Sequence, residues 1–242
     1  MGGGDFGKAV LDGDAEIGEI HKVHLTWNRN NERWNRNKRG IDPAGVDWQR
    51  FLGSAPQQPY DEYRFRNWRW FWDFGGGIFT DLMVHHLDIA HWFLGLDTPT
   101  EVVAIGDQFA AKDLWQTPDT VQCLLKYPKQ QVQVHFEGTF VNARNGEMLE
   151  FMGTDATLYL DRGRYEILPE RNKKIQPSEL VLGTGPKGAD YYDQPEGEVL
   201  HLANWLECIR TRNKPNAPAE AGVSAAGVAH LANRALREPI PR

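Results

Sequence analysis

Four side chains with acid, base or aromatic chemistry recur along one apolar segment of the sequence, residues 78–94. They are Asp81, His85, Asp88 and Trp92. Their i, i+4, i+7, i+11 spacing places them within about 60° of one another on a helix. A buried carboxylate is costly unless it is paired, and side chains at i and i+4 are neighbours. We therefore expect Asp81 to orient His85 and raise its basicity, so that His85 can take a proton from a substrate hydroxyl.

Two other interpretations of this stripe remain open from the residues alone. Asp81 could serve only the helix N-terminus, where the helix dipole favours negative charge, and His85 could be a satisfied core histidine. Alternatively, His85, Asp88 and His91 are residue types that bind metal ions. His91, however, lies about 120° from His85 around the helix. We therefore predict acid–base chemistry at this helix and no metal.

The segment before the helix could provide contacts to a substrate. Eight of the 15 residues from 60 to 74 are aromatic, and aromatic rings offer rigid apolar faces. Three glycines follow at 75–77, where backbone without a Cβ lets a ligand approach closely. Trp68 and Arg69 stand nearest these glycines and are the candidates for substrate contact. Packing beneath the helix is an equally good explanation of the aromatic residues.

Composition and charge narrow the class of protein. The net charge of −6 over 242 residues argues against broad nucleic-acid binding. Two tryptophans and five basic residues in the stretch 27–39 could form a nucleic-acid patch, but a solvated loop, or a loop packed on another domain or subunit, explains them better. No segment reaches the roughly 18 apolar residues of a membrane span, and the first residues do not resemble a signal peptide. We therefore expect a cytoplasmic protein.

Hydrophobic periodicity predicts one α+β domain over residues 1–242, an antiparallel sheet with helices on one face. Helices are expected over 46–53, 78–94, 196–211 and 219–236. Residues 28–45 and 171–195 have the composition of loops. Seven segments have the period of strands: 19–28, 100–110, 119–128, 130–140, 148–154, 156–161 and 164–170. The last six of these are expected to form an antiparallel meander.

Several segments together resemble one known family, the Gfo/Idh/MocA (glucose–fructose oxidoreductase / inositol dehydrogenase) family. The stretch from Trp68 to Gly95 is similar to the family's helix with the pattern GGG…D-x-x-x-H-x-x-D. Further matching segments follow in the family's order: "EIGEIHKVHLTWNRN", "DWQRFLGSAPQQPY", "TPDTVQCLLKYP", "GTDATLYLDRGRYEILPE", "HLANWLECIR" and "KPNAPAEAGVSAAGVAHLANRAL". The resemblance covers nearly the whole chain, and it is to the C-terminal domain of the family.

The resemblance implies a fold and an activity. The fold is an open, mostly antiparallel sheet with helices on one face, and the sheet's other face often forms a homo-oligomer interface. The activity is hydride transfer between NAD or NADP and a sugar, polyol or related hydroxyl compound. The motif makes His85 the acid/base and Asp81 its partner or a contact to a substrate hydroxyl. The other expected site residues contact substrate (Trp68, Arg69 and Asp88) or cofactor (Gly76 and Gly77).

The sequence departs from the family in one large respect. The cofactor should be bound mainly by a Rossmann domain, whose fingerprint and Glu-Lys-Pro lysine are absent here. The spacing GxGxxG also occurs at Gly2, Gly4 and Gly7, but the sequence predicts no strand before these glycines, which the dinucleotide-binding motif requires. Residues 1–18 are interpreted as the tail of a linker from a missing NAD(P)-binding domain, and the chain alone is expected to be inactive. The alternative is a non-catalytic, stand-alone carbohydrate-binding or assembly module.

Overall fold

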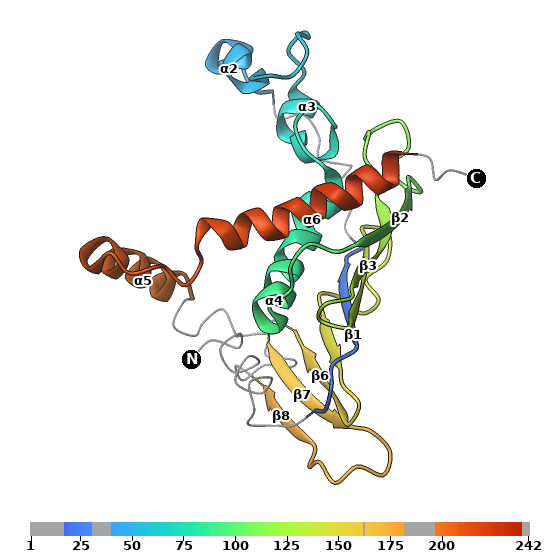
Figure 1. Ribbon diagram of the computed structural model, residues 1–242. Helices are drawn as coiled ribbons and strands as arrows, with labels where there is room; N and C mark the ends of the chain where they lie inside the picture. The colour runs from blue at the N-terminus through green and yellow to red at the C-terminus, as the bar shows by residue number, and fades with distance from the viewer. Residues whose placement is uncertain (1–16, 31–39, 162, 182–196, 239–242) are drawn as a thin grey trace.

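Figure 1 presents a computed structural model of the chain, which describes residues 17–30, 40–161, 163–181 and 197–238. The strands of these residues form one eight-stranded sheet in the order β2-β3-β4-β1-β5-β6-β7-β8. Their bounds are β1 Lys22–Asn28, β2 Glu101–Asp107, β3 Thr120–Tyr127, β4 Val132–Thr139, β5 Leu149–Met152, β6 Ala156–Leu160, β7 Arg164–Pro169 and β8 Ser178–Val181.

The sheet is mixed but mostly antiparallel. β1 runs parallel to β4 and antiparallel to β5, and the other neighbouring strands pair antiparallel. The predicted α+β fold with a mostly antiparallel sheet is therefore confirmed. The meander expected over the later strands is broken, because β1 inserts between β4 and β5.

Helices cover one face of this sheet (Figure 1). The principal helices are α4 Val84–Leu94, α5 Gly197–Thr211 and α6 Ala219–Arg237, and the short ones are α2 Trp48–Leu52 and α3 Glu62–Arg66. Single turns form at η3 Pro43–Gly45, η4 Trp68–Trp70 and η5 Phe79–Met83. α4 and α6 lie against the sheet and against each other, whereas α5 extends away from them.

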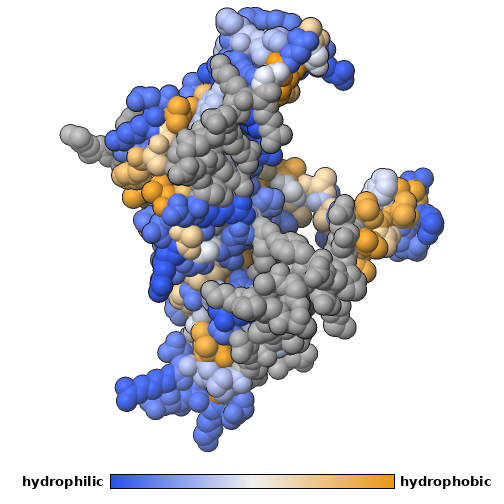
Figure 2. Space-filling view, turned by 180° about the vertical axis from the view of Figure 1, so that it is seen from behind, coloured by the Kyte–Doolittle hydropathy of each residue, from blue (hydrophilic) through white to orange (hydrophobic). Residues whose placement is uncertain are grey.

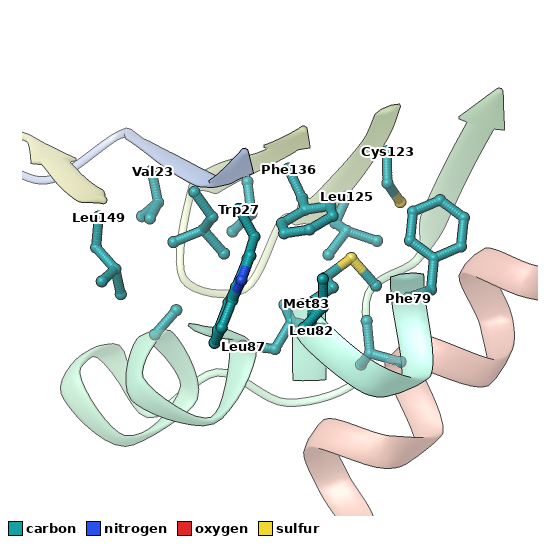
Figure 3. Close-up of a cluster of buried hydrophobic side chains, with 14 of the residues drawn as sticks. Val23, Trp27, Phe79, Leu82, Met83, Leu87, Cys123, Leu125, Phe136 and Leu149 are labelled. Carbon is teal, nitrogen blue, oxygen red and sulfur yellow. The ribbon is translucent and has the colours of Figure 1, made fainter. Parts of the chain in front are cut away.

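The core lies between the sheet and the helical layer (Figure 3). Inward-facing residues of β3 and β4, such as Leu125 and Phe136, meet Phe79, Met83 and Leu87 from the helical side. Strand β3 alternates between buried and exposed residues, which is the period-two pattern of a strand with one covered face. α6 contributes small side chains to the interface, so it can approach closely.

Three local elements differ from the sequence prediction. β8 lies inside the expected loop 171–195, and α3 lies inside the aromatic segment that has no clear period. The predicted helix 78–94 begins as a π-helical turn, η5, before α4 continues to Gly95, whose φ of 58° ends the helix in the left-handed region. A π turn is a local change confined to a single turn, which a periodicity taken over the whole segment does not resolve.

Within the described ranges, no helix has both the length and the apolar character needed to cross a membrane.

Candidate functional site

A polar pocket with a volume of about 260 Å³ opens where the segment before the long helix meets its first two turns. It combines the part of the chain around η4 with η5 and the start of α4. Its lining residues are Arg66, Asn67, Arg69, Trp70, Asp81, Leu82 and His85. Asp81 and His85, selected from the sequence by their spacing, therefore line one pocket.

Asp81 projects from the π-helical turn η5 and pairs with an arginine. The Arg69 Nε donates a hydrogen bond to the Asp81 Oδ1 over 2.6 Å. π turns are rare and occur often at functional sites, since the extra residue redirects the neighbouring side chains. The turn thus presents the Asp81 carboxylate to the η4 segment rather than leaving it to solvent.

His85 occupies the first turn of α4 and is exposed. Its ring lies 5.5 Å, centroid to centroid, from the indole of Trp27, which is a buried residue of β1. In the described part of the chain Asp81 and His85 make no hydrogen bond to each other. The partner that the carboxylate takes is Arg69, so the direct pairing of Asp81 with His85 stays a prediction.

The remaining residues of the stripe lie beyond the pocket. Asp88 and Trp92 are exposed on α4 and are not among the lining residues. Although Asp88 is exposed overall, neighbouring atoms desolvate its carboxyl and raise its pKa, and the nearby His85 opposes that shift. A substrate contact at Asp88 would therefore require a ligand that extends one turn past His85.

The aromatic segment contains both exposed and buried side chains. Trp68 is 36% exposed, and the guanidinium carbon of Arg69 lies 4.3 Å from its ring centroid. Trp70 is buried and stacks on Trp115 at 4.4 Å. Trp70 lines the pocket and Trp68 does not, so packing accounts for Trp70 and the substrate contact at Trp68 stays a prediction.

The sequence prediction missed two polar lining residues, Arg66 and Asn67. Asn67 is buried, and its Nδ2 donates a hydrogen bond to the Tyr63 carbonyl over 2.9 Å. Its Oδ1 is enclosed and has no hydrogen-bond partner among the described residues. The density of arginine and asparagine between 64 and 69 was the available signal, but without a period it could not say which side chains face the pocket.

The glycines before the helix have close neighbours within this chain. A Cβ on Gly76 would lie 2.3 Å from the Asn233 Nδ2, and one on Gly77 would lie 2.7 Å from the Thr117 Cβ. Gly77 also has a φ of 64°, which favours glycine. These contacts explain why glycine stands at both positions, and the cofactor contact there stays a prediction.

Histidine and carboxylate side chains do not gather into a metal site in the described ranges. His91 faces away from His85 into the protein, where its Nδ1 lies 2.9 Å from the Ser224 Oγ and its Nε2 3.0 Å from the Tyr127 hydroxyl. The basic residues from 31 to 39 and the glycines of the first seven residues lie outside the described residues.

The chain matches a known domain family and a set of solved structures. Residues 49–159 match the GFO/IDH/MocA C-terminal domain. None of the curated proteins compared matches the sequence.

Three of the solved structures are enzymes that act on sugars according to their names. A UDP-N-acetylglucosamine 3-dehydrogenase from Acidithiobacillus ferrooxidans is 13% identical, with a TM-score of 0.57, over 92% of this chain and 55% of that one. Levoglucosan dehydrogenase, in complex with NADH and levoglucosan, is 15% identical, with a TM-score of 0.61, over 94% and 59% of the two chains. The aldose-aldose oxidoreductase of Caulobacter crescentus, complexed with glycerol, is 15% identical, with a TM-score of 0.61, over 97% and 58%.

At these sequence identities the similarity to the solved structures shows the fold alone. The present chain spans between half and two thirds of the length of each relative. The matching segment contains Asp81, His85 and the whole lining of the pocket. Residues 49–159, and the pocket within them, are therefore similar to the C-terminal domain of the GFO/IDH/MocA family.

Proposed function

We propose that this chain is the substrate-binding and acid–base domain of an NAD- or NADP-dependent oxidoreductase that acts on a sugar, polyol or related hydroxyl compound. The observation that carries the proposal is the convergence of Asp81, His85 and Arg69 on one polar pocket within the family segment. The relative that binds NADH and levoglucosan supports the choice of cofactor and substrate class.

The described residues do not fit the cofactor by themselves. They form no doubly wound parallel sheet of the kind that binds dinucleotides. The side chains of Asn233 and Thr117 lie where a ligand would approach Gly76 and Gly77. A nicotinamide held by a separate domain would provide the hydride chemistry, and this chain would bind and orient the substrate.

His85 is the proposed acid/base of the reaction. An exposed imidazole at the pocket can accept the proton of a substrate hydroxyl as the alcohol becomes a carbonyl, and it can return the proton in the reverse direction. Asp81 and Arg69 hold each other across the pocket, so their remaining hydrogen-bonding groups can fix substrate hydroxyls.

The test begins with the reading frame upstream of the codon for Met1. If it continues into a dinucleotide-binding domain, the longer protein should oxidise members of a panel of sugars and polyols with NAD⁺ or NADP⁺. His85→Ala should then lower kcat by about 10²–10⁴-fold and leave the melting temperature unchanged. The matched control is His230→Ala, an exposed histidine of α6. Normal turnover by the His85→Ala protein would exclude His85 as the acid/base.

The alternative function, a carbohydrate-binding or assembly module without catalysis, predicts a different result. A stop codon upstream of Met1, together with sugar binding by the purified chain in the absence of nicotinamide, would favour the module. The upstream reading frame and turnover separate the two functions, because a substrate domain and a module can both bind sugar without nicotinamide, whereas only the enzyme needs a dinucleotide-binding domain.

We also propose that the chain forms a homo-oligomer through the uncovered face of the sheet. Val103 and Leu124 are opposite residues of β2 and β3 on that face, and they are 49% and 55% exposed. Beside them His135 stacks on His24 with the ring centroids 4.8 Å apart, and the stack continues the face onto β1. An apolar and aromatic band on an open sheet face is typical of a surface that pairs with another copy.

A further inference from the structure

The pocket contains more arginines than carboxylates. The chain has a net charge of −6, yet two arginines, Arg66 and Arg69, line the pocket, and among the described residues only one carboxylate, Asp81, does so. Arginine keeps its charge at any physiological pH. A ligand group that bears negative charge can therefore pair with an arginine of this pocket.

Arg69 retains hydrogen-bonding capacity on the pocket side. Within the described residues its guanidinium makes one hydrogen bond, from Nε to Asp81, and its side chain is 41% exposed. Arg164 by contrast donates from Nε to Asp161 and from Nη1 to Glu166, and its side chain is 24% exposed. Since a guanidinium has five N–H groups, both Nη atoms of Arg69 remain available to a ligand.

The Arg69 guanidinium is also held in a fixed orientation. Asp81 binds its Nε edge at 2.6 Å, and the indole of Trp68 lies against its carbon at 4.3 Å. A planar group that is already fixed on two sides loses little conformational entropy when it binds a third partner. Planar arginine forks match the oxygens of carboxylates and phosphates in two-point hydrogen bonding.

The volume of the pocket limits the size of the ligand. About 260 Å³ lies below the roughly 300–1,000 Å³ of sites that enclose drug-sized molecules. The space therefore suits one sugar unit with its substituent better than an oligosaccharide.

We infer that the substrate is a single sugar or polyol that carries a carboxylate or a phosphate, and that Arg69 binds this anionic group. The inference rests on the proposed function, which supplies the sugar and the role of His85. The anion binds at the free Nη edge of Arg69, beside the carboxylate of Asp81. A substrate hydroxyl then lies toward His85, so the charged group determines which carbon of the sugar meets the acid/base.

Calorimetric titration of the 242-residue chain with matched ligands tests the inference. The ligands are glucose, glucuronate, glucose 6-phosphate and inorganic phosphate, with galactose and galacturonate as a second stereochemical series. At least one acidic sugar should bind about tenfold or more tightly than its neutral counterpart, because charge-assisted hydrogen bonds are about twice as strong as neutral ones. The preference should shrink as salt rises from about 0.01 to 0.5 M, since salt screens exposed charges.

Two variants assign the preference to Arg69. Arg69→Gln should remove the preference, and Arg69→Lys, which keeps the charge but not the planar fork, should retain part of it. Arg50→Gln, an exposed arginine of α2, is the matched control and should bind like the unaltered chain. Melting temperatures of all three variants show whether they remain folded. An undiminished preference in folded Arg69→Gln would overturn the assignment.

The outcomes separate this inference from the proposed function. Equal binding of neutral and acidic sugars overturns the inference and leaves the proposed function standing. Binding of inorganic phosphate as tightly as glucose 6-phosphate overturns it too, because the sugar would then contribute nothing. Failure of every ligand to bind overturns the inference, whereas the proposed function is tested separately by turnover of the longer protein and its His85→Ala variant.

Discussion

At the scale of the residue, His91 shows how a titratable group can be structural. It connects α4 to β3 and α6 through the Tyr127 hydroxyl and the Ser224 hydroxyl, and burial lowers its pKa below the ordinary value. The pKa of His135 is lowered as well, first by burial and then by the neighbouring His24. Both histidines therefore bind a proton more weakly in the folded chain than in the unfolded chain.

We predict that stability is lost as the pH falls below the ordinary histidine pKa of about 6.5. Above that value the histidines are neutral in both the folded and the unfolded chain, so the full free energy of unfolding is present. Below it the unfolded chain binds protons before the folded chain does, and the free energy of unfolding falls. Urea unfolding at about pH 7.5 and 5.5 measures the difference. His91→Gln should show a smaller loss over this interval than the unaltered chain, while exposed His230→Gln should show the same loss. Equal losses in all three proteins would contradict the prediction.

The candidate site was predictable where its residues are close in sequence. Asp81 and His85 share a pocket because a helix brings residues four positions apart together, and this holds even though the turn between them is of the π type. The Arg69–Asp81 pair and the enclosed Asn67 depend on how η4 folds back onto η5. The sequence from 60 to 74 has no period from which that fold could be deduced.

At the scale of the element, the junction of the glycines with α6 fixes where the long helix begins. The Asn233 Nδ2 donates a hydrogen bond to the Gly76 carbonyl over 2.8 Å, and the Gly76 amide donates to the Thr80 hydroxyl over 3.0 Å. α6 therefore holds the start of η5, the turn that carries Asp81. A substitution that breaks these hydrogen bonds should therefore alter the position of Asp81 in the pocket.

We predict opposite effects of alanine at two glycines. Gly76→Ala should destabilise the chain by about 1–3 kcal/mol, because its Cβ meets Asn233 and Thr80 at 2.3 and 2.7 Å. Gly227→Ala, in α6 with open space around it, should stabilise by about 0.5–1 kcal/mol, since alanine restricts the unfolded chain and favours the helix. Urea unfolding measures both. A neutral Gly76→Ala would mean that the junction yields without strain.

Most elements were predictable because they are amphipathic. The alternation in β3 and β4 and the long apolar helix appear directly in the sequence. The position of β1 within the sheet could not be predicted from the sequence, because its period-two pattern suits an edge strand as well as a central one. Its final residues are buried in part by the stretch after β4: the Thr26 hydroxyl donates to the Gly146 carbonyl and the Asn28 Nδ2 to the Arg144 carbonyl. Such non-local contacts leave no periodic signal.

At the scale of the whole molecule, the described residues expose apolar side chains on the outer face of the sheet and on α5. Figure 2 shows apolar residues gathered on α5, which extends from the body of the protein. Val199, Leu202, Trp205, Leu206 and Ile209 are all exposed there. Contiguous apolar surface of this kind is uncommon on proteins that remain monomeric.

We predict that Leu124→Glu weakens self-association. A carboxylate in the apolar band of the sheet face would be desolvated in an interface between copies, and that costs several kcal/mol. Size-exclusion chromatography with light scattering at about 10–100 µM should show the unaltered chain as an oligomer and the variant as a smaller species. Val223→Glu places the same charge on α6, at a residue that is 71% exposed, and should leave the oligomer intact. A monomeric unaltered chain would exclude the proposed interface.

The central position of β1 has a consequence for synthesis on the ribosome. β1 precedes every other strand of the described chain, yet Lys22 pairs with Gln133 of β4 and with Met152 of β5. The edge of β1 that faces β4 therefore stays unpaired until residue 139 has left the exit tunnel, and the edge that faces β5 stays unpaired until residue 152 has left it. Unpaired strands on nascent chains are prone to aggregation, and non-local pairing is slow. The two halves of the sheet, β2–β4 and β5–β8, can each pair as they emerge, but β1 is enclosed on both edges only when they join across it.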